Sequence, residues 1–193
     1  MKHRVCARGI AAASLAFAAT SASAAPPVAA CANALPVVAS PSEAKPASGN
    51  QVGKSLDELV RDNAAAVGTD EELGCLAGAV YFEARGEPLE GQLAVAEVVL
   101  NRAASGEYPA SICEVVKQPA QFSFVRNGLF PPIDETSVAW RTAVTVAHIA
   151  FEKLADELAP DVLWYHADYV APAWGRRLAR VSQIGAHIFY RRG

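Results

Sequence analysis

Histidine and cysteine are scarce in this chain, and their scarcity argues against several kinds of enzyme. The 193 residues include four histidines and four cysteines, and no HExxH pattern is present. A zinc hydrolase needs two or three histidines at ligand spacing, so zinc chemistry is not expected. The sequence also lacks the GxSxG pattern of many serine hydrolases. We therefore predict no metal site and no cofactor.

A long hydrophobic run is also missing. The apolar run at 10–19 follows a basic start and precedes a small-residue Ala-Ser-Ala site that ends at Ala24. This is the pattern of a secretory signal peptide, and the run is too short to cross a bilayer. We expect residues 1–24 to be removed on export, which predicts a periplasmic protein without a transmembrane segment in the mature chain.

Positive charge is in short supply once that segment is gone. Its loss removes Lys2, Arg4 and Arg8 and moves the formal net charge from −3 to −6. A mildly acidic protein does not hold a polyanion by charge alone, which argues against nucleic acid as a partner.

The residues before Cys31 are similar to a lipobox, so a lipid anchor at Cys31 is an alternative to cleavage after Ala24.

Residues 25–53 are rich in alanine, proline and serine and carry almost no charge. Such a composition predicts a disordered leader. Folded structure should begin at Lys54, because Ser55 and Glu58 form a capping-box pattern in front of an apolar repeat. Residues 54–193 are thus predicted to form one folded domain.

The most informative stretch is 74–102, GCLAGAVYFEARGEPLEGQLAVAEVVLNR. Counted in helical steps, Glu83 lies on the flank of an apolar stripe, in the last turn of a helix that starts with a cap at Thr69 and ends at Gly86. Partial burial disfavours a charged carboxylate and raises its pKa, as a general acid near neutral pH requires. A second helix, from Pro88, is apolar almost all round and should be the central buried helix.

The remaining patterns predict a mainly helical α+β fold. A short capped helix over 111–118 precedes an extended segment at 121–125 and a long scaffold helix from about 135 to 156. Near the C-terminus, residues 162–166 and 184–190 alternate and are rich in aromatic and β-branched side chains. They are predicted to form two strands of a small antiparallel sheet.

The string YFEARGEPLEGQLAVAEVVLNR, followed by YPASICEVV, QFSF and a closing IGAHIFY, resembles the cell-wall hydrolase family typified by the spore cortex-lytic enzyme SleB. The resemblance runs in order from Leu73 to Tyr190. It implies a lysozyme-like domain related to lytic transglycosylases, with peptidoglycan glycan strands as substrate and Glu83 as the catalytic acid. Many members from Gram-negative bacteria have cysteines where this chain has Ala120 and Arg126.

The polar members of the segment 121–125 are candidates for binding the glycan. Gln121 and Ser123 could line a groove beside Glu83, as the resemblance favours. The alternative is a buried edge strand that places Phe122 and Phe124 in the core.

Aromatic residues near the C-terminus offer flat apolar faces on which sugar rings stack, and neighbouring polar groups could bond hydroxyl or acetamido groups. Glu87 could cap backbone amides of the following helix or tune the pKa of Glu83 by like-charge repulsion. The complete set of candidate substrate-binding residues is Glu87, Gln121, Ser123, Tyr165, His166, Asp168 and Trp174.

A second catalytic carboxylate is not evident. Many glycosidases hold an acid and a second carboxylate across the scissile bond. Glu87 is too close to Glu83 in sequence to reach the opposite face of a sugar, and Glu97 lies on a charged helix face that should point to solvent. Asp168 remains a candidate on sequence distance alone.

A single-acid lytic transglycosylase suits this inventory best, cutting between N-acetylmuramic acid and N-acetylglucosamine. A hydrolytic muramidase and a non-catalytic peptidoglycan-binding envelope protein are the alternatives. Protein partners are not identified by the sequence.

Two cysteines remain in the predicted domain. Cys75 lies in the helix that carries Glu83, and Cys113 lies in the short helix over 111–118. Export favours a disulfide between them, with buried free thiols as the alternative. Such a bridge would stabilise the domain by roughly 3–4 kcal/mol.

Overall fold

The computed structural model describes residues 53–65, 68 and 70–193. The predicted signal peptide, Cys31 and nearly all of the predicted leader lie outside this range. The described elements are α1 (Leu56–Asn63), α2 (Glu71–Ala84), α3 (Leu89–Ala104), α4 (Ile112–Lys117), α5 (Val138–Phe151), β1 (Val162–Ala167), the 3₁₀ helix η1 (Ala173–Arg177), β2 (Ala179–Ile184) and β3 (His187–Arg191).

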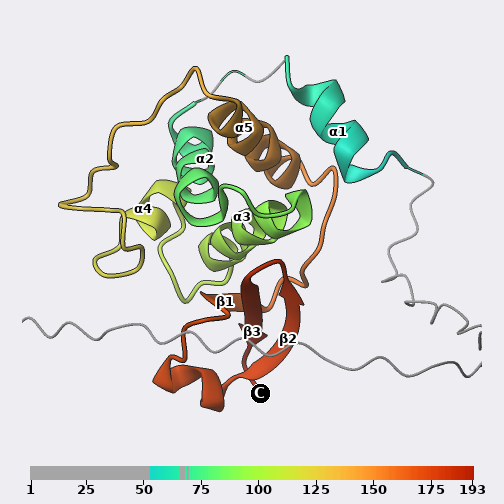
Figure 1. Ribbon diagram of the computed structural model, residues 1–193. Coiled ribbons are helices and arrows are strands. Elements are labelled where there is room, and N and C mark those ends of the chain that lie inside the picture. The colour runs from blue at the N-terminus through green and yellow to red at the C-terminus, as the bar shows by residue number, and fades with distance from the viewer. Residues whose placement is uncertain (1–52, 66–67, 69) are drawn as a thin grey trace, which may run out of the picture. The chain divides into compact units, whose positions relative to one another are not determined.

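The buried helix α3 is the centre of the fold, as predicted. It contacts α2, α4 and α5, and it also packs against strands β1 and β2 (Figure 1). Most of its side chains are buried because its apolar residues run almost all round the helix. The helices and the small antiparallel sheet give the predicted α+β fold.

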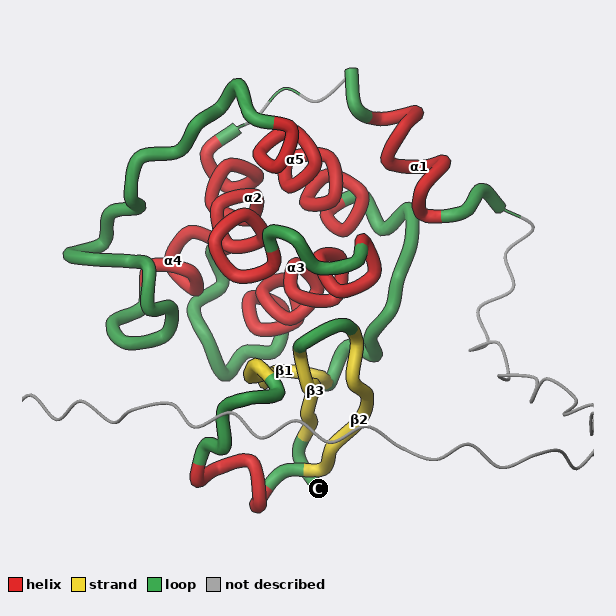
Figure 2. Tube along the Cα trace, viewed as in Figure 1, coloured by secondary structure: helices red, strands yellow, loops and turns green. Residues whose placement is uncertain are grey.

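The sheet has the strand order β1-β3-β2, with both pairs antiparallel (Figure 2). The two predicted strands correspond to β1 and β3, which pair with each other, but β2 was not predicted, and the stretch 184–190 also includes the end of β2 and a turn. Gly185 makes this turn with a φ of +55°, a conformation that glycine adopts without strain. The missed strand β2 is largely exposed, so the sequence gives it little apolar signal.

Local capping signals place most helix starts correctly. Ser55 and Glu58 form the predicted capping box of α1, and Ser111 caps α4 by accepting the amide of Glu114. The cap of α2 is Asp70, which accepts the amide of Leu73 at 2.8 Å, in place of the expected Thr69, which lies outside the described residues.

Two predicted elements differ from the structure. The long helix is shorter than expected: Ser137 caps the start of α5, and Lys153, at a φ of +54°, lies just past its end. Residues 121–125 form turns, so the predicted extended segment was wrong. Its Phe122 nevertheless packs into the core, as the alternative prediction held.

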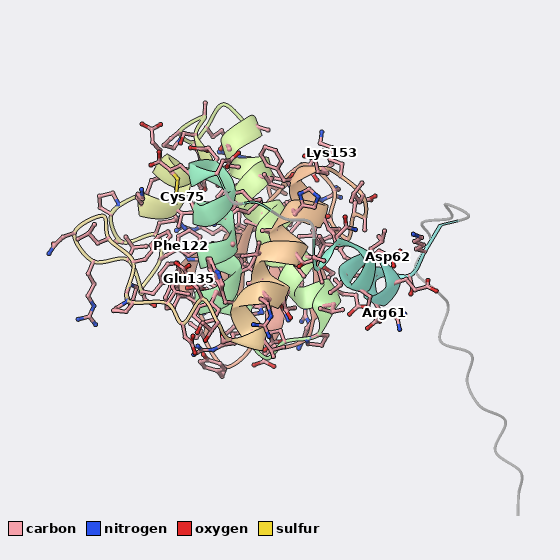
Figure 3. All side chains as sticks on the ribbon, turned by 90° about the horizontal axis from the view of Figure 1, so that it is seen from above. Arg61, Asp62, Cys75, Phe122, Glu135 and Lys153 are labelled. Atoms are coloured by element: carbon pink, nitrogen blue, oxygen red, sulfur yellow. A yellow bond between two sulfur atoms is a disulfide. The ribbon has the colours of Figure 1, made fainter. Side chains whose placement is uncertain are left out.

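The predicted disulfide between Cys75 and Cys113 is confirmed (Figure 3). It joins α2 to α4, two helices that also pack directly against each other. Within the described ranges, the helices are too short or too polar to cross a bilayer.

Candidate active site

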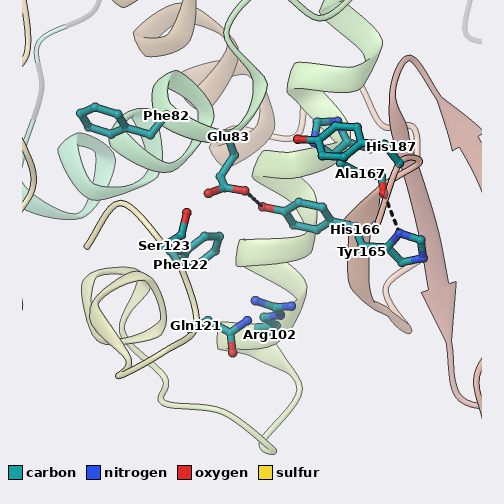
Figure 4. A pocket seen from close by; sticks show the side chains of 11 residues that line it. Phe82, Glu83, Arg102, Gln121, Phe122, Ser123, Tyr165, His166, Ala167 and His187 are labelled. Carbon is teal, nitrogen blue, oxygen red and sulfur yellow. Dashed lines mark hydrogen bonds between the residues drawn. The ribbon is translucent and has the colours of Figure 1, made fainter. Parts of the chain in front are cut away.

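Glu83 lies in the last turn of α2, which ends at Ala84. The next residues turn sharply away, because Gly86 takes a left-handed conformation with a φ of +92°. The Glu83 side chain is half-buried, and its Oε2 accepts a hydrogen bond from the hydroxyl of Tyr165 on β1 at 3.3 Å (Figure 4). The prediction that Glu83 is partly withdrawn from water is therefore confirmed.

Glu83 faces a cavity of about 290 Å³ between the helices, the loop after α4 and the sheet. Its lining comes from α2, α3, the turns at 121–123, strand β1 with the turn that follows it, and β3. The lining residues are Phe82, Glu83, Arg102, Gln121, Phe122, Ser123, Tyr165, His166, Ala167, Tyr169 and His187.

Four of the predicted substrate-binding residues line this cavity together with Glu83. Gln121 and Ser123 lie on the wall formed by the loop after α4, and Tyr165 and His166 come from β1. The His166 ring bonds outward through Nε2 to the hydroxyl of Tyr190 at 2.9 Å, which fixes its orientation.

Three predicted residues lie outside the cavity lining. The Glu87 carboxylate accepts the amide of Ala186 at 2.8 Å and so fastens the turn between β2 and β3, and the start of α3 has no side-chain cap. Trp174, in η1, packs edge-on against His166. Asp168 is exposed just after β1.

Arg102 and His187 line the cavity but were not among the predicted site residues. Arg102 closes the EVVLNR part of the first motif, and His187 lies in IGAHIFY. Both residues lie within the motifs that carry the family resemblance, and these motifs were the signal that could have identified them as site residues. Side-chain chemistry alone did not single them out, because their position depends on packing between α3 and the sheet.

The environment of Glu83 contains opposing effects on its pKa. Burial raises the pKa above its ordinary value and is the largest effect, while the Tyr165 hydrogen bond and the positive charge of Arg102 lower it. Burial also raises the pKa of Tyr165 well above its usual value, so its hydroxyl stays neutral and donates. The result is an acid that holds its proton more tightly than an exposed glutamate does.

Arg102 is an unusually buried cation, with only 3% of its surface exposed. Its Nε donates to the carbonyl of Leu163 at 2.7 Å, and its guanidinium lies over the ring of Tyr108 at 5.2 Å. Its Nη1 is buried without a hydrogen-bond partner. Among the described residues no ion pair involves Arg102, so its charge is held close to the cavity by packing and by the bond to Leu163.

His187 borders the same cavity beside Tyr165, with the two rings edge to face at 5.3 Å. Its Nδ1 is buried without a partner. Burial lowers the pKa of His187, so the ring is neutral at neutral pH. It can exchange hydrogen bonds as a neutral group, but it does not supply a second positive charge.

Glu97 corrects the prediction of a solvent-facing stripe on α3. Only 7% of its surface is exposed, and its carboxylate accepts the backbone amides of Glu157 and Leu158 at 2.9 Å each. Burial raises its pKa to about 7. Glu97 fastens the connection between α5 and β1 and does not line the cavity. In the described ranges, no group of three or more His, Cys, Asp or Glu is arranged to hold a metal ion.

Comparison with known proteins gives the class to which this fold and cavity belong. The model of the Cell Wall Hydrolase family matches residues 86–190, which is more than half of the chain. The chain belongs to the cell wall hydrolase family, a class of enzyme, as the sequence resemblance predicted. The matched range begins at Gly86, three residues after Glu83.

Spore cortex-lytic enzymes are among the proteins that this chain resembles in sequence. Those of Bacillus subtilis and Oceanobacillus iheyensis are each 34% identical to this chain over 63% of its length. The chain spans only 38% and 42% of the length of these two relatives.

Two solved structures resemble this fold. The catalytic domain of the germination-specific lytic transglycosylase SleB from Bacillus anthracis superposes with a TM-score of 0.54 and 30% identity, covering 65% of this chain and 98% of that domain. The catalytic domain of the Bacillus cereus SleB protein gives a TM-score of 0.51 at 30% identity, covering 67% and 96%. The likeness therefore spans nearly the whole of each catalytic domain.

Proposed function

We propose that this protein cleaves the glycan strands of peptidoglycan between N-acetylmuramic acid and N-acetylglucosamine, as a lytic transglycosylase with Glu83 as its single catalytic acid. One observation carries the proposal. In the part of the chain that the structure describes, Glu83 is the only carboxylic acid that lines the polar cavity. The family, and the similarity to a domain named as a lytic transglycosylase, support the substrate and the reaction class.

The proposed reaction uses Glu83 first as an acid and then as a base. Protonated Glu83 gives its proton to the bridging glycosidic oxygen, and the bond from that oxygen to C1 of N-acetylmuramic acid breaks. The Glu83 carboxylate then takes the proton of the C6 hydroxyl as O6 bonds to C1, which gives a 1,6-anhydro end. The acid is restored and no water is consumed.

The surroundings of Glu83 suit both halves of this cycle. Burial favours the protonated form before the reaction, whereas the Tyr165 hydroxyl and the Arg102 charge favour the carboxylate that forms when the proton leaves. Gln121 and Ser123 offer polar groups to the sugar along the cavity walls, whereas both ring nitrogens of His166 are bonded to Ala167 and Tyr190.

Replacing Glu83 provides the central test. We expect Glu83→Gln to bind purified sacculi but to cleave them at least about 100-fold more slowly, since general acid catalysis contributes factors of about 10²–10⁴. The matched control is Glu114→Gln, which removes an exposed carboxylate on α4. Equal cleavage by wild type and Glu83→Gln would show that Glu83 is not the catalytic acid. If wild type binds sacculi without cleaving them, the non-catalytic alternative is favoured.

The chemical nature of the products separates the two enzymatic alternatives. Mass spectrometry of wild-type digests should show 1,6-anhydro ends, which are lighter than reducing ends by one water. Reducing ends alone would identify a hydrolytic muramidase and leave the substrate class intact.

We propose in addition that the protein is exported to the periplasm after cleavage following Ala24. The disulfide between Cys75 and Cys113 supports an oxidising compartment. Peptidoglycan, the proposed substrate, is found outside the inner membrane.

A further inference from the structure

A second cavity, of about 490 Å³, is lined by later residues of the loop that forms one wall of the Glu83 cavity. It is lined by Phe124, Arg126, Leu129, Phe130 and Pro131. Four of these five side chains are apolar and one is a cation. Such a lining suits a ligand that combines small apolar groups with negative charge.

A pair of stacked rings connects the linings of the two cavities. Phe82 lines the Glu83 cavity and stacks on Phe124, which lines the second cavity, with ring centroids 4.7 Å apart. Figure 4 shows the Phe82 ring on the side of α2 away from the Glu83 carboxylate. The two cavities are therefore neighbours across this pair of rings.

Arg126, the cation that lines the second cavity, lies in a tight turn. Arg126 and Leu129 exchange both backbone hydrogen bonds, each at 3.0 Å, around Asn127 and Gly128, which have positive φ angles of 54° and 73°. Residues paired in this way project their side chains from the same face. The turn thus holds a guanidinium beside the apolar Leu129 side chain, which is 70% exposed.

Gly78 allows the Phe130 ring, which lines the second cavity, to pack against the helix that carries Glu83. A Cβ atom at this position would lie 2.6 Å from Cε2 of Phe130, so only glycine lets the Phe130 ring lie against α2. The Phe130 ring also packs against Phe124 and Phe82. The apolar wall is therefore held in a set position relative to the acid.

We propose that the second cavity binds the peptide stem carried by the muramic acid residue of a strand bound at Glu83, an inference that rests on the proposed function. Stem peptides combine small aliphatic side chains with free carboxylates. The phenylalanine, leucine and proline side chains suit the former, and Arg126 suits the latter because guanidinium binds carboxylate with two parallel hydrogen bonds. Among the ion pairs of the described residues, none involves Arg126, so its charge is open to a ligand.

The experiment compares two forms of one substrate. Wild type, Arg126→Ala and Arg126→Glu are assayed on intact sacculi and on strands stripped of their stems by an amidase. Arg61→Ala is the matched control, because it removes an exposed arginine from α1, which Figure 3 shows on the opposite side of the molecule from Phe122.

We expect Arg126→Ala to lower kcat/KM on intact sacculi by about tenfold, the factor that corresponds to 1.4 kcal/mol. Arg126→Glu should lower it further, through charge repulsion. On stripped strands, both variants should match wild type and Arg61→Ala. Equal losses on both substrates, or no loss on either, would overturn the assignment of the second cavity to the stem.

A binding measurement keeps this inference separate from the proposed reaction. NMR of labelled protein titrated with an isolated anionic stem tetrapeptide should shift the signals of residues 124–131 in wild type but not in Arg126→Glu. Such shifts without cleavage of either substrate would reject the proposed function and leave a peptide-binding cavity. Cleavage without such shifts would retain the proposed function and reject the stem site, and shifts confined to other residues would place the peptide elsewhere and reject it as well.

Discussion

At the scale of single residues, the behaviour of Glu83 depends on a balance between burial and two neighbours. Burial raises its pKa, and Tyr165 and Arg102 each lower it. Each neighbour comes from a different element, β1 for Tyr165 and α3 for Arg102. The acidity of the group is therefore set by how α3 and the sheet pack around the end of α2.

Replacing Tyr165 should change the pH dependence of cleavage. A general acid works only while protonated, so activity falls as pH rises through its pKa. Tyr165→Phe removes a hydrogen bond that lowers the Glu83 pKa, and the alkaline limb of kcat/KM should therefore move to higher pH. Tyr169→Phe is the control, since Tyr169 lines the cavity with 86% of its surface exposed and makes no hydrogen bond to Glu83. A limb that stays in place in Tyr165→Phe, or moves equally in both variants, contradicts this reading.

The sequence locates the acid better than it locates the rest of the site. Glu83 is identifiable because its half-burial follows from the spacing of apolar residues along a single helix. Arg102 and His187 enter the same cavity from 19 and 104 residues away in sequence, through contacts that local patterns do not encode. Trp174 has an aromatic face on which a sugar could stack, but its ring packs edge-on against His166 and does not line the cavity.

At the scale of elements, α3 does more than fill the core. Its buried Glu97 binds the backbone of the connection from α5 to β1, and Asn101, one turn further on, donates to the carbonyl of Ala159 at 3.0 Å. This connection leads into the strand that carries Tyr165. The polar residues of α3 therefore position the sheet that completes the cavity.

Glu97 should make the stability of the fold depend on pH. Its pKa is about 7 in the folded protein, above the ordinary value of 4.5, so the folded state binds more protons between these values. Its contribution is fully present below pH 4.5 and is lost as pH rises through 7, by on the order of 3 kcal/mol.

Urea unfolding of wild type and Glu97→Gln at several pH values tests this expectation. The glutamine variant stays neutral and should lack this part of the decline, while Glu135→Gln, which removes an exposed carboxylate, should follow wild type. Parallel curves for wild type and Glu97→Gln from pH 4.5 to 7.5 would show that Glu97 does not titrate with a raised pKa.

The same helix shows why some elements were predicted and others were not. Capping and apolar periodicity are local, so α1, α3 and α4 were recognisable from the sequence. The burial of Glu97 depends on amides 60 residues away, and a charged residue on a helix otherwise signals solvent. The strand β2 was missed because its stability comes from pairing with β3, while its own side chains are mostly exposed.

At the scale of the whole molecule, the described domain carries the proposed catalysis, and export is the role that we propose for the start of the chain. Mass spectrometry of the protein isolated from a periplasmic fraction should find a chain that begins at Ala25, since a signal peptidase cuts after small residues. A chain that begins at a lipid-modified Cys31 would show the lipobox alternative, and an intact Met1 in the cytoplasmic fraction would contradict export.

The bond between Cys75 and Cys113 has a consequence for the shape of the active centre. It ties the helix that bears the acid to the helix from which the facing loop departs, with Gln121 four residues beyond the end of α4. The disulfide therefore limits the movement of the facing loop relative to the helix that carries Glu83. In the proposed function, the width of the cleft that receives a sugar chain is thus set in part by a covalent bond that an oxidising compartment favours.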